Sequence, residues 1–196
     1  MEKSRIQLQR AATREMAEAD LYDAITEEHL QSWEAGWAKA MKAHCEGLPG
    51  EAEPEDSQWE WRPIVNYFRN NPASNSFAIV CDGELQGMMI TEVAESVDGK
   101  PLIYVGWLAT APWNRPEVQT PPRYKGVGGA MVAAAVELSR QKGFGGRIAL
   151  HSLPAAEPFY RKCRMDDLGF DEAKRMEYFE MTEAQADIFC PKKTTP

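Results

Sequence analysis

The stretch Arg123-Tyr124-Lys125-Gly126-Val127-Gly128-Gly129-Ala130 decides the fold prediction for this chain. It places three glycines at the entry to a segment with helical spacing, directly after two cationic side chains. Because glycine has no Cβ, its backbone can approach a bulky anion and turn N–H groups toward it. A helix that begins there adds the partial positive charge of its N-terminus. We interpret these eight residues as a seat for a diphosphate group.

Two other phosphate-binding motifs are excluded at this position. A dinucleotide-binding Gly-x-Gly-x-x-Gly that starts at Gly126 needs a glycine where Met131 stands. The nucleoside-triphosphate loop ends in Gly-Lys-Ser/Thr, a tripeptide that the sequence lacks. Apolar residues recur at helical spacing from Val127 to Leu138, and Gly143 supplies a stop. We therefore predict a helix that packs its apolar stripe on a sheet and leaves its N-terminus open to a ligand.

Composition sets the broad class of protein. A length of 196 residues, 43% hydrophobic and 27% charged, fits one globular domain with a full core. The net charge of −8 argues against a broad nucleic-acid surface. The four cysteines and three histidines lack metal-ligand spacing, so no metal is expected. The sequence has neither a long apolar run nor a signal-peptide core, so we expect a cytoplasmic protein that does not bind membranes.

The N-terminal part is predicted to be helical. Residues 5–24 and 26–46 are interpreted as helices, with Thr26 as the cap of the second. An exposed loop is expected over residues 47–58, and Ser57 has the spacing of a helix cap. Four tryptophans in this region are expected to pack in the core rather than to bind a ligand: Trp33, Trp37, Trp59 and Trp61.

From residue 76 the pattern becomes that of a sheet. A hairpin is predicted around Asp82-Gly83, and a turn at Asp98-Gly99 leads into a buried strand from residue 102. The elements expected after the glycine-rich helix are a strand at 147–151, a helix around Phe159 and Tyr160, a strand at 177–181 and a helix capped by Thr182. A strand, a helix and a second strand in succession predict a crossover in a partly parallel sheet.

Four motifs in this order resemble the GNAT acetyltransferase superfamily over residues 76–181. Arg123-x-x-Gly126-x-Gly128 matches the family's acetyl-CoA pyrophosphate signature, Gln/Arg-x-x-Gly-x-Gly/Ala. The end of strand 102–110, Ala109 to Pro112, is similar to the family strand that pairs with the pantetheine arm, and strand 147–151 follows in order. Ala156-Glu157-Pro158-Phe159-Tyr160 resembles the family's Ala-x-x-Phe/Leu-Tyr.

The resemblance implies the fold and the co-substrate. It implies an α/β (α+β) fold with a mixed, partly parallel central sheet flanked by helices, an N-terminal helical segment, and one domain over residues 1–196. It also implies that acetyl-CoA binds at the end of the buried strand and at the glycine-rich loop. The implied binding residues are Leu108, Ala109, Thr110, Arg123, Tyr124, Lys125, Gly126, Val127, Gly128, Gly129 and Ala130.

Acetyl transfer to an amine requires a deprotonated amine, a stabilised carbonyl oxygen and a protonated thiolate. Tyr160 is the expected acid for the thiolate. Glu92 and His151 are the alternative bases, with ordered water as the intermediary, and Glu157 is a third option. Cys163 has no histidine at compatible spacing, so direct transfer in a ternary complex is expected rather than an acyl-cysteine.

Two departures from the family pattern leave local questions open. The insert from Trp113 to Pro122 is either a surface loop or a flap over the acceptor. The Gly-Phe pair that usually follows the family's tyrosine is absent at the usual spacing. We take Arg164-Met165 as its equivalent rather than Gly169-Phe170, because this choice preserves the helix from Tyr160.

The function expected from the resemblance is transfer of an acetyl group from acetyl-CoA to a primary amine on a small molecule or a peptide. The alternative is a non-catalytic acyl-CoA-binding sensor or interaction module. An acetyltransferase acting on aminoacyl-tRNA is disfavoured by the acidity of the chain. No nucleic-acid partner is expected, and the oligomeric state is left open, a homodimer included.

Overall fold

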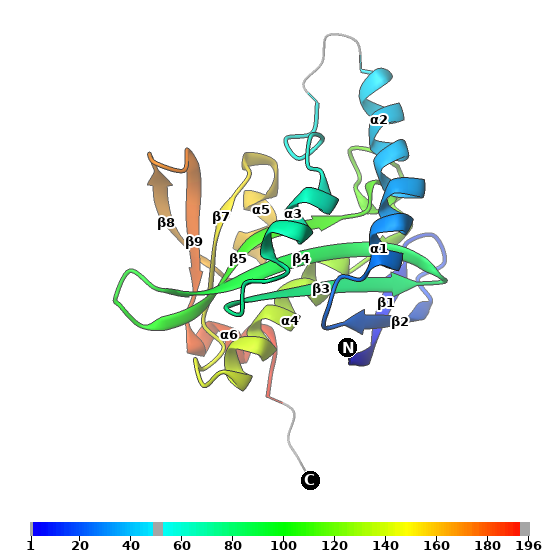
Figure 1. Ribbon diagram of the computed structural model, residues 1–196. Helices are drawn as coiled ribbons and strands as arrows, with labels where there is room; N and C mark the ends of the chain where they lie inside the picture. Colours follow the sequence, from blue (N-terminus) through cyan, green and yellow to red (C-terminus); the bar gives the residue numbers. More distant parts are fainter. Residues whose placement is uncertain (1, 49–52, 193–196) are drawn as a thin grey trace. The chain divides into compact units, whose positions relative to one another are not determined.

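The computed structural model describes residues 2–48 and 53–192 (Figure 1). Contacts divide the chain into two compact units: unit 1 comprises Met1–Ile90 and Trp107–Met131, and unit 2 comprises Thr91–Gly106 and Val132–Pro196. Strands β4 (Glu84–Glu95) and β5 (Pro101–Thr110) and helix α4 (Val127–Gln141) contribute residues to both units. A single-domain organisation stays a prediction.

Unit 1 contains β1 (Lys3–Arg10), β2 (Met16–Tyr22), β3 (Ser74–Cys81) and the short β6 (Tyr124–Lys125). The strand order there is β6-β1-β2-β3-β4-β5, and β1 is antiparallel to both β2 and β6. The hairpin predicted at Asp82-Gly83 is confirmed, since this pair joins β3 to β4.

The helix predicted over residues 5–24 is wrong, because these residues form β1, a turn and β2. Ile6 and Leu8 alternate with polar residues, which is the period of two that places one face of a strand against a core. The register pairs Ile6 with Ala19 and Leu8 with Ala17, so both strands present their apolar residues to the same side. The turn between them contains Arg14, whose φ is 64°.

The second predicted helix is confirmed as α1 (Glu27–Ser32), a π-helical turn (Trp33–Trp37) and α2 (Ala38–Glu46), which form one long rod in Figure 1. Thr26 caps it as predicted by accepting a hydrogen bond from the backbone N–H of His29. The following loop has neither helix nor strand in its described part, and residues 49–52 lie outside the described residues.

The helix cap predicted at Ser57 is wrong. Helix α3 runs over Trp61–Phe68 with Glu60 at its N-cap, and the Ser57 hydroxyl instead donates to Glu53 Oε2 at 3.0 Å. Pro63 explains the later start, because proline is tolerated only in the first turn, where its missing N–H is not needed.

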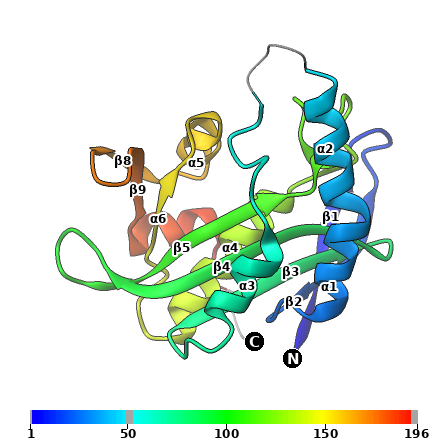
Figure 2. The same cartoon turned by 45° about the horizontal axis from the view of Figure 1, so that its top comes forward.

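The core of unit 1 lies between these helices and the strands. Figure 2 shows α1 and α3 on the same face of β3 and β4. Leu30, Trp37 and Trp61 from the helical segments are almost fully buried against Ala78 of β3 and Met88 of β4. The expectation of core packing is therefore confirmed for Trp37 and Trp61, whereas Trp33 and Trp59 pack against the edge of this core and remain partly exposed.

Unit 2 has the strand order β4-β5-β7-β9-β8, with β7 at Ile148–Ser152, β8 at Asp166–Asp171 and β9 at Met176–Met181. Strands β5 and β7 are parallel, with Ile103 opposite Ile148, and β9 is antiparallel to β7 and β8. This parallel pair confirms the mixed, partly parallel sheet. Strand β8 was not predicted, because all but one of its residues are exposed and no apolar alternation marks it.

The helices of unit 2 are α5 (Glu157–Lys162), α6 (Glu183–Phe189) and the C-terminal part of α4. The predicted stop of α4 at Gly143 is confirmed, since its φ is 80°, a backbone conformation that glycine adopts without strain. After α5, Arg164 adopts a φ of 67° and Met165 is buried. A left-handed residue followed by a buried one is what a Gly-Phe pair provides, which supports Arg164-Met165 as its equivalent.

Candidate functional site

The glycine-rich loop of unit 1 is open at its surface. Gly126 has a φ of 93°, and a Cβ built on Gly126 or Gly129 meets no other atom within 4 Å. The Gly126 carbonyl accepts the first hydrogen bond of α4, from the N–H of Ala130 at 2.9 Å. The N–H groups ahead of Ala130 have no acceptor within the helix, so they are available to an anion. The donors and the open space fit a diphosphate.

Arg123 and Tyr124 hold the loop through their side chains. The guanidinium of Arg123 lies 4.8 Å from the ring centroid of Trp113 and forms an ion pair with Glu84. Tyr124 is 3% exposed, and its hydroxyl donates to Asp82. These two predicted binding residues are thus engaged with the protein, and Lys125 is exposed, as is the ion-paired Arg123.

Gly87 on β4 brings the start of α4 close to the strand. A Cβ on Gly87 would lie 2.9 Å from Val127 Cγ1 and 3.0 Å from Met131 Cε. Real Cβ atoms essentially never lie under 3.0 Å from another atom, so any larger residue at position 87 would force Val127 to shift. The position of the glycine-rich loop in unit 1 therefore depends on Gly87, which lies outside the motif at residues 123–130.

The end of β5 continues into the proline-rich insert. Ala109 is buried, whereas Leu108 and Thr110 are partly exposed. The amide oxygen of buried Gln86 accepts from Trp113 Nε1 and Asn114 Nδ2, both at 2.9 Å. Asn114 Oδ1 in turn accepts from the backbone N–H of Tyr124 at 2.9 Å. The first residues of the insert are therefore a support for the glycine-rich loop, and the flap interpretation is confined to residues 116–122.

His151 of unit 2 bonds through both ring nitrogens. Its Nε2 lies 3.0 Å from Asp171 Oδ2, and its Nδ1 lies 2.8 Å from the Tyr104 hydroxyl. The hydrogen bond from His151 is the main cause that lowers the pKa of Asp171, followed by bonds from the N–H groups of Ala173 and Lys174. An ionised carboxylate can only accept, so Nε2 carries the hydrogen toward Asp171; when Nε2 alone is protonated, Nδ1 accepts from the Tyr104 hydroxyl.

The structure groups both predicted bases around Tyr104, a residue that the sequence reasoning missed. Burial raises the pKa of Tyr104, a hydrogen bond with the backbone of His151 lowers it, and the charges of Asp171 and Glu92 raise it further. The signal available in the sequence was a tyrosine in an otherwise apolar strand. Its place near His151 follows from the parallel register, which pairs Tyr104 with Ala149.

Tyr160 lies on α5 in unit 2 and is 6% exposed. Its ring contacts Phe159 at 5.1 Å and Phe179 at 6.0 Å between centroids. Burial, with a smaller contribution from Cys163, raises the pKa of Tyr160 well above its ordinary value. The hydroxyl therefore stays protonated at neutral pH and can donate.

Cys163 is unsuited to a covalent step. Its side chain is 3% exposed, and burial raises the pKa of the thiol to about 11. The thiolate is the nucleophilic form of cysteine, and it is scarce at neutral pH when the pKa is this high. Within the described residues no cluster of histidine, cysteine, aspartate or glutamate has a geometry that holds a metal ion. None of the described helices is long and apolar enough to cross a membrane.

Comparison with known proteins identifies the fold. The chain matches no protein-family model and no curated protein. Among solved structures it is similar to the PaiA N-acetyltransferase of Thermoplasma acidophilum in complex with coenzyme A. The identity is 14%, the match covers 84% of this chain and 98% of that one, and the TM-score is 0.56.

Two further solved structures are also similar to this chain in fold. A Desulfovibrio desulfuricans chain described as an acetyltransferase of the GNAT family is 12% identical, with 84% and 99% coverage and a TM-score of 0.57. FeeM, an N-acyl amino acid synthase from uncultured soil microbes, is 9% identical, with 89% and 96% coverage and a TM-score of 0.55. At such low identity these likenesses show the fold, and that fold is the one of the GNAT acetyltransferases.

Proposed function

We propose that this chain, which has the fold of GNAT acetyltransferases, transfers an acetyl group from acetyl-CoA directly to a primary amine. The observation that carries the proposal is the open glycine-rich loop at the start of α4. Gly126 and Gly129 leave room for a diphosphate, and the free N–H groups of the first helical turn supply its donors. Lys125 adds a positive charge at the same place.

The remaining binding contacts are assigned to the end of β5. In this proposal the backbone N–H groups of Leu108, Ala109 and Thr110 face the acyl group, and one of them stabilises the carbonyl oxygen as negative charge develops. Val127 and Ala130 contribute backbone rather than side chains, whereas Arg123 and Tyr124 position the loop through Glu84, Trp113 and Asp82.

Tyr160 is proposed as the acid that protonates the departing thiolate, because its hydroxyl remains protonated in its buried position. The amine loses its proton to Glu92 or His151, directly or through water. For His151 the hydrogen bond to Tyr104 suggests a relay: the Tyr104 hydroxyl passes its proton to Nδ1 and accepts one from the ammonium group. The buried Cys163 thiol supports direct transfer over an acyl-cysteine.

The decisive experiment measures CoA release with a reagent for free thiol across a panel of primary amines, together with the melting temperature in the presence of acetyl-CoA. We expect stabilisation by acetyl-CoA alone and amine-dependent thiol release. Stabilisation without thiol release from any amine would favour the acyl-CoA-binding module. An unchanged melting curve in millimolar acetyl-CoA would overturn both.

A further inference from the structure

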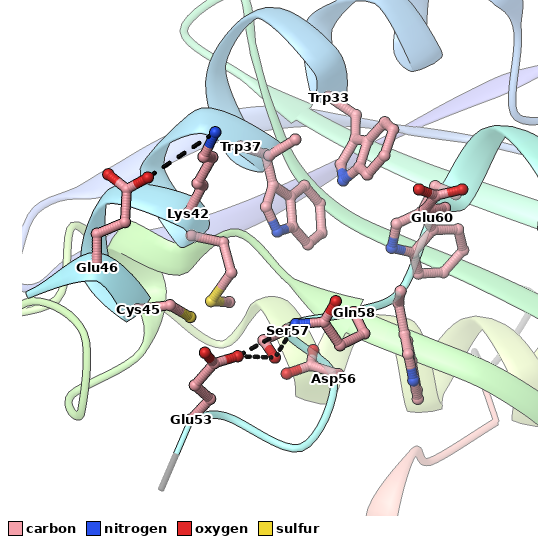
Figure 3. A pocket seen from close by; sticks show the side chains of 14 residues that line it. Trp33, Trp37, Lys42, Cys45, Glu46, Glu53, Asp56, Ser57, Gln58 and Glu60 are labelled. Carbon is pink, nitrogen blue, oxygen red and sulfur yellow. Dashed lines mark hydrogen bonds and ion pairs between the residues drawn. The ribbon is translucent and has the colours of Figure 1, made fainter. Parts of the chain in front are cut away.

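A cavity of about 480 Å³ in unit 1 lies between the helical segment that contains Trp33 and Trp37 and the loop that contains Glu53 and Gln58 (Figure 3). Its walls include four of the six tryptophans of the chain and four carboxylates. We call it the tryptophan pocket and define it by Trp33, Trp37, Trp59, Trp61, Glu53 and Glu60. All of these residues belong to unit 1.

The tryptophans at the base of the pocket are almost fully buried, and those at its rim are partly exposed. Trp37 and Trp61 are 3% and 1% exposed, and their ring centroids lie 6.5 Å apart. Trp59 meets Trp61 edge to face at 6.4 Å and, like Trp33, is only partly buried. The face of an indole ring attracts cations more strongly than any other aromatic side chain does. The rim tryptophans therefore offer such a surface to an organic cation.

In the part of the chain that the structure describes, two of the four carboxylates of the pocket are paired with cations, and two are not. Glu46 pairs with Lys42 at 3.8 Å, and Asp56 pairs with Arg115. Glu53 accepts hydrogen bonds from the neutral groups of Ser57 and Gln58, at 3.0 and 3.1 Å (Figure 3), and its other side-chain partner within the described residues is the Cys45 thiol.

Glu60 is exposed at the start of α3 and makes no side-chain cap bond there. Within the described residues neither Glu53 nor Glu60 forms a salt bridge. The pocket therefore combines two unpaired negative charges with aromatic faces.

The pocket adjoins the strand end assigned to the acyl group. Trp59 contacts Trp107 of β5 with ring centroids 4.7 Å apart. Arg115 links Asp56 of the pocket to the Thr110 carbonyl, which its Nε reaches at 2.8 Å. A molecule held in the pocket is thus next to the end of β5 within the same unit.

We propose that the tryptophan pocket binds the non-reacting, positively charged end of the acceptor. The proposal rests on the proposed acetyl transfer and specifies the acceptor: a primary amine joined by an apolar spacer to a second, permanently cationic group. Carboxylates and indole faces stabilise an ammonium group and raise its pKa. A nitrogen held there would be a poor nucleophile, so the nitrogen that is acetylated lies outside the pocket.

The test uses two probes that differ only in charge. One is a primary alkylamine that ends in a trimethylammonium group, and the other is the same alkylamine ending in a tert-butyl group. Binding is measured by tryptophan fluorescence and calorimetry without acetyl-CoA. We expect the cationic probe to bind about 10-fold more tightly, with an advantage that falls as ionic strength rises.

Substitutions in the pocket test which residues cause the preference for the cationic probe. Glu53→Gln combined with Glu60→Gln should lower affinity for the trimethylammonium probe by about 5- to 20-fold and change binding of the tert-butyl probe, which carries only the charge of its primary ammonium, much less. Trp33→Leu keeps an apolar side chain but removes the aromatic face, and should reduce the charge preference about 3- to 10-fold. The control is Glu172→Gln, which removes one negative charge from an exposed turn of unit 2 and is compared with the single variants Glu53→Gln and Glu60→Gln; it should change nothing.

Equal binding of the two probes, or an unchanged preference in the double glutamine variant, would overturn the inference. The outcome is independent of catalysis, because no acetyl-CoA is present. Cation binding without thiol release would retain the pocket and reject the acetyltransferase. Thiol release with amines that show no charge preference in binding would support the acetyltransferase and reject the cation-binding pocket.

Discussion

The guanidinium of Arg115 holds the carboxylate of Asp56 through two parallel hydrogen bonds, each 2.7 Å long. Both side chains are nearly buried, with 11% and 12% of their surfaces exposed. The third donor of Arg115, Nε, reaches the Thr110 carbonyl. One residue therefore fastens the loop of the tryptophan pocket to the end of β5 within unit 1. Because the fork of arginine donors is planar and rigid, lysine cannot reproduce this link.

Arg115→Met should destabilise the protein by about 3–5 kcal/mol, because it leaves the Asp56 carboxylate buried without its partner. Urea unfolding measures this free energy. Asp56→Leu in the Arg115→Met background removes the stranded charge and should recover much of the loss. Strict additivity of the two single changes would show that the pair is not coupled.

Gly128→Asp should abolish binding of acetyl-CoA, since it places a carboxylate where the diphosphate is proposed to lie. The wild-type melting temperature should rise by roughly 5–10 °C at acetyl-CoA 100 times above its dissociation constant, which adds about 2.7 kcal/mol.

Gly128→Asn is the matched control of equal size without charge, and it should retain part of the shift. The unliganded Asp variant should melt close to wild type, because an acidic residue is favourable at a helix N-terminus. An Asp variant with the full acetyl-CoA shift would move the diphosphate away from this loop.

Local chemistry made much of the fold predictable. Asp82-Gly83, Gly143 and the Thr182–Gln185 pair each favour one backbone conformation whatever surrounds them, and the structure confirms a turn, a helix stop and a capping box there. The N-terminal strands were missed because short segments with alanine and glutamate satisfy helical and strand periods at once. Only pairing between β1 and β2, such as Leu8 with Ala17, decides between them.

The candidate site was predictable only in part for the same reason. The glycine-rich loop and Tyr160 are marked by residues adjacent in sequence. By contrast, the group of Tyr104, His151 and Asp171 forms through the parallel register of β5 with β7 and a side-chain contact from β7 to β8 across the intervening β9. The tryptophan pocket likewise forms between two segments of the chain, and no local sequence pattern predicts that these segments lie side by side. The sequence signal of four tryptophans was interpreted as core, which is correct for the buried rings and incomplete for the rim.

Asp171 should make the protein sensitive to acid. Its pKa is lowered in the folded state, so below about pH 4 the unfolded chain binds its proton first. The stability from this carboxylate is present above that pH and is lost as the pH falls through the lowered value. Asp171→Asn should therefore flatten the decline of the urea midpoint between about pH 5 and about pH 2. The exposed neighbour change Glu172→Gln is the control, and an equal slope in both variants would contradict the assignment.

Tyr160→Phe tests the proposed general acid with the smallest change. Phenylalanine retains the packing against Phe159 and Phe179 and removes only the hydroxyl. If this hydroxyl protonates the thiolate, kcat should fall by about 10²–10⁴, while the thermal shift from acetyl-CoA stays near the wild-type value. Tyr67→Phe makes the same substitution at a residue that is 81% exposed, and its kcat should equal that of wild type.

Two further measurements, the free energy of unfolding and the dependence of kcat on the leaving group, distinguish a catalytic role of Tyr160 from a packing role. A packing defect would lower stability and kcat together at every pH, whereas loss of an acid leaves the unfolding free energy nearly unchanged. Leaving groups discriminate further: a thioester whose thiol is a stronger acid needs less protonation, so the deficit of Tyr160→Phe should shrink with it. A kcat within about threefold of wild type on acetyl-CoA would assign the proton to water and leave Tyr160 a packing role.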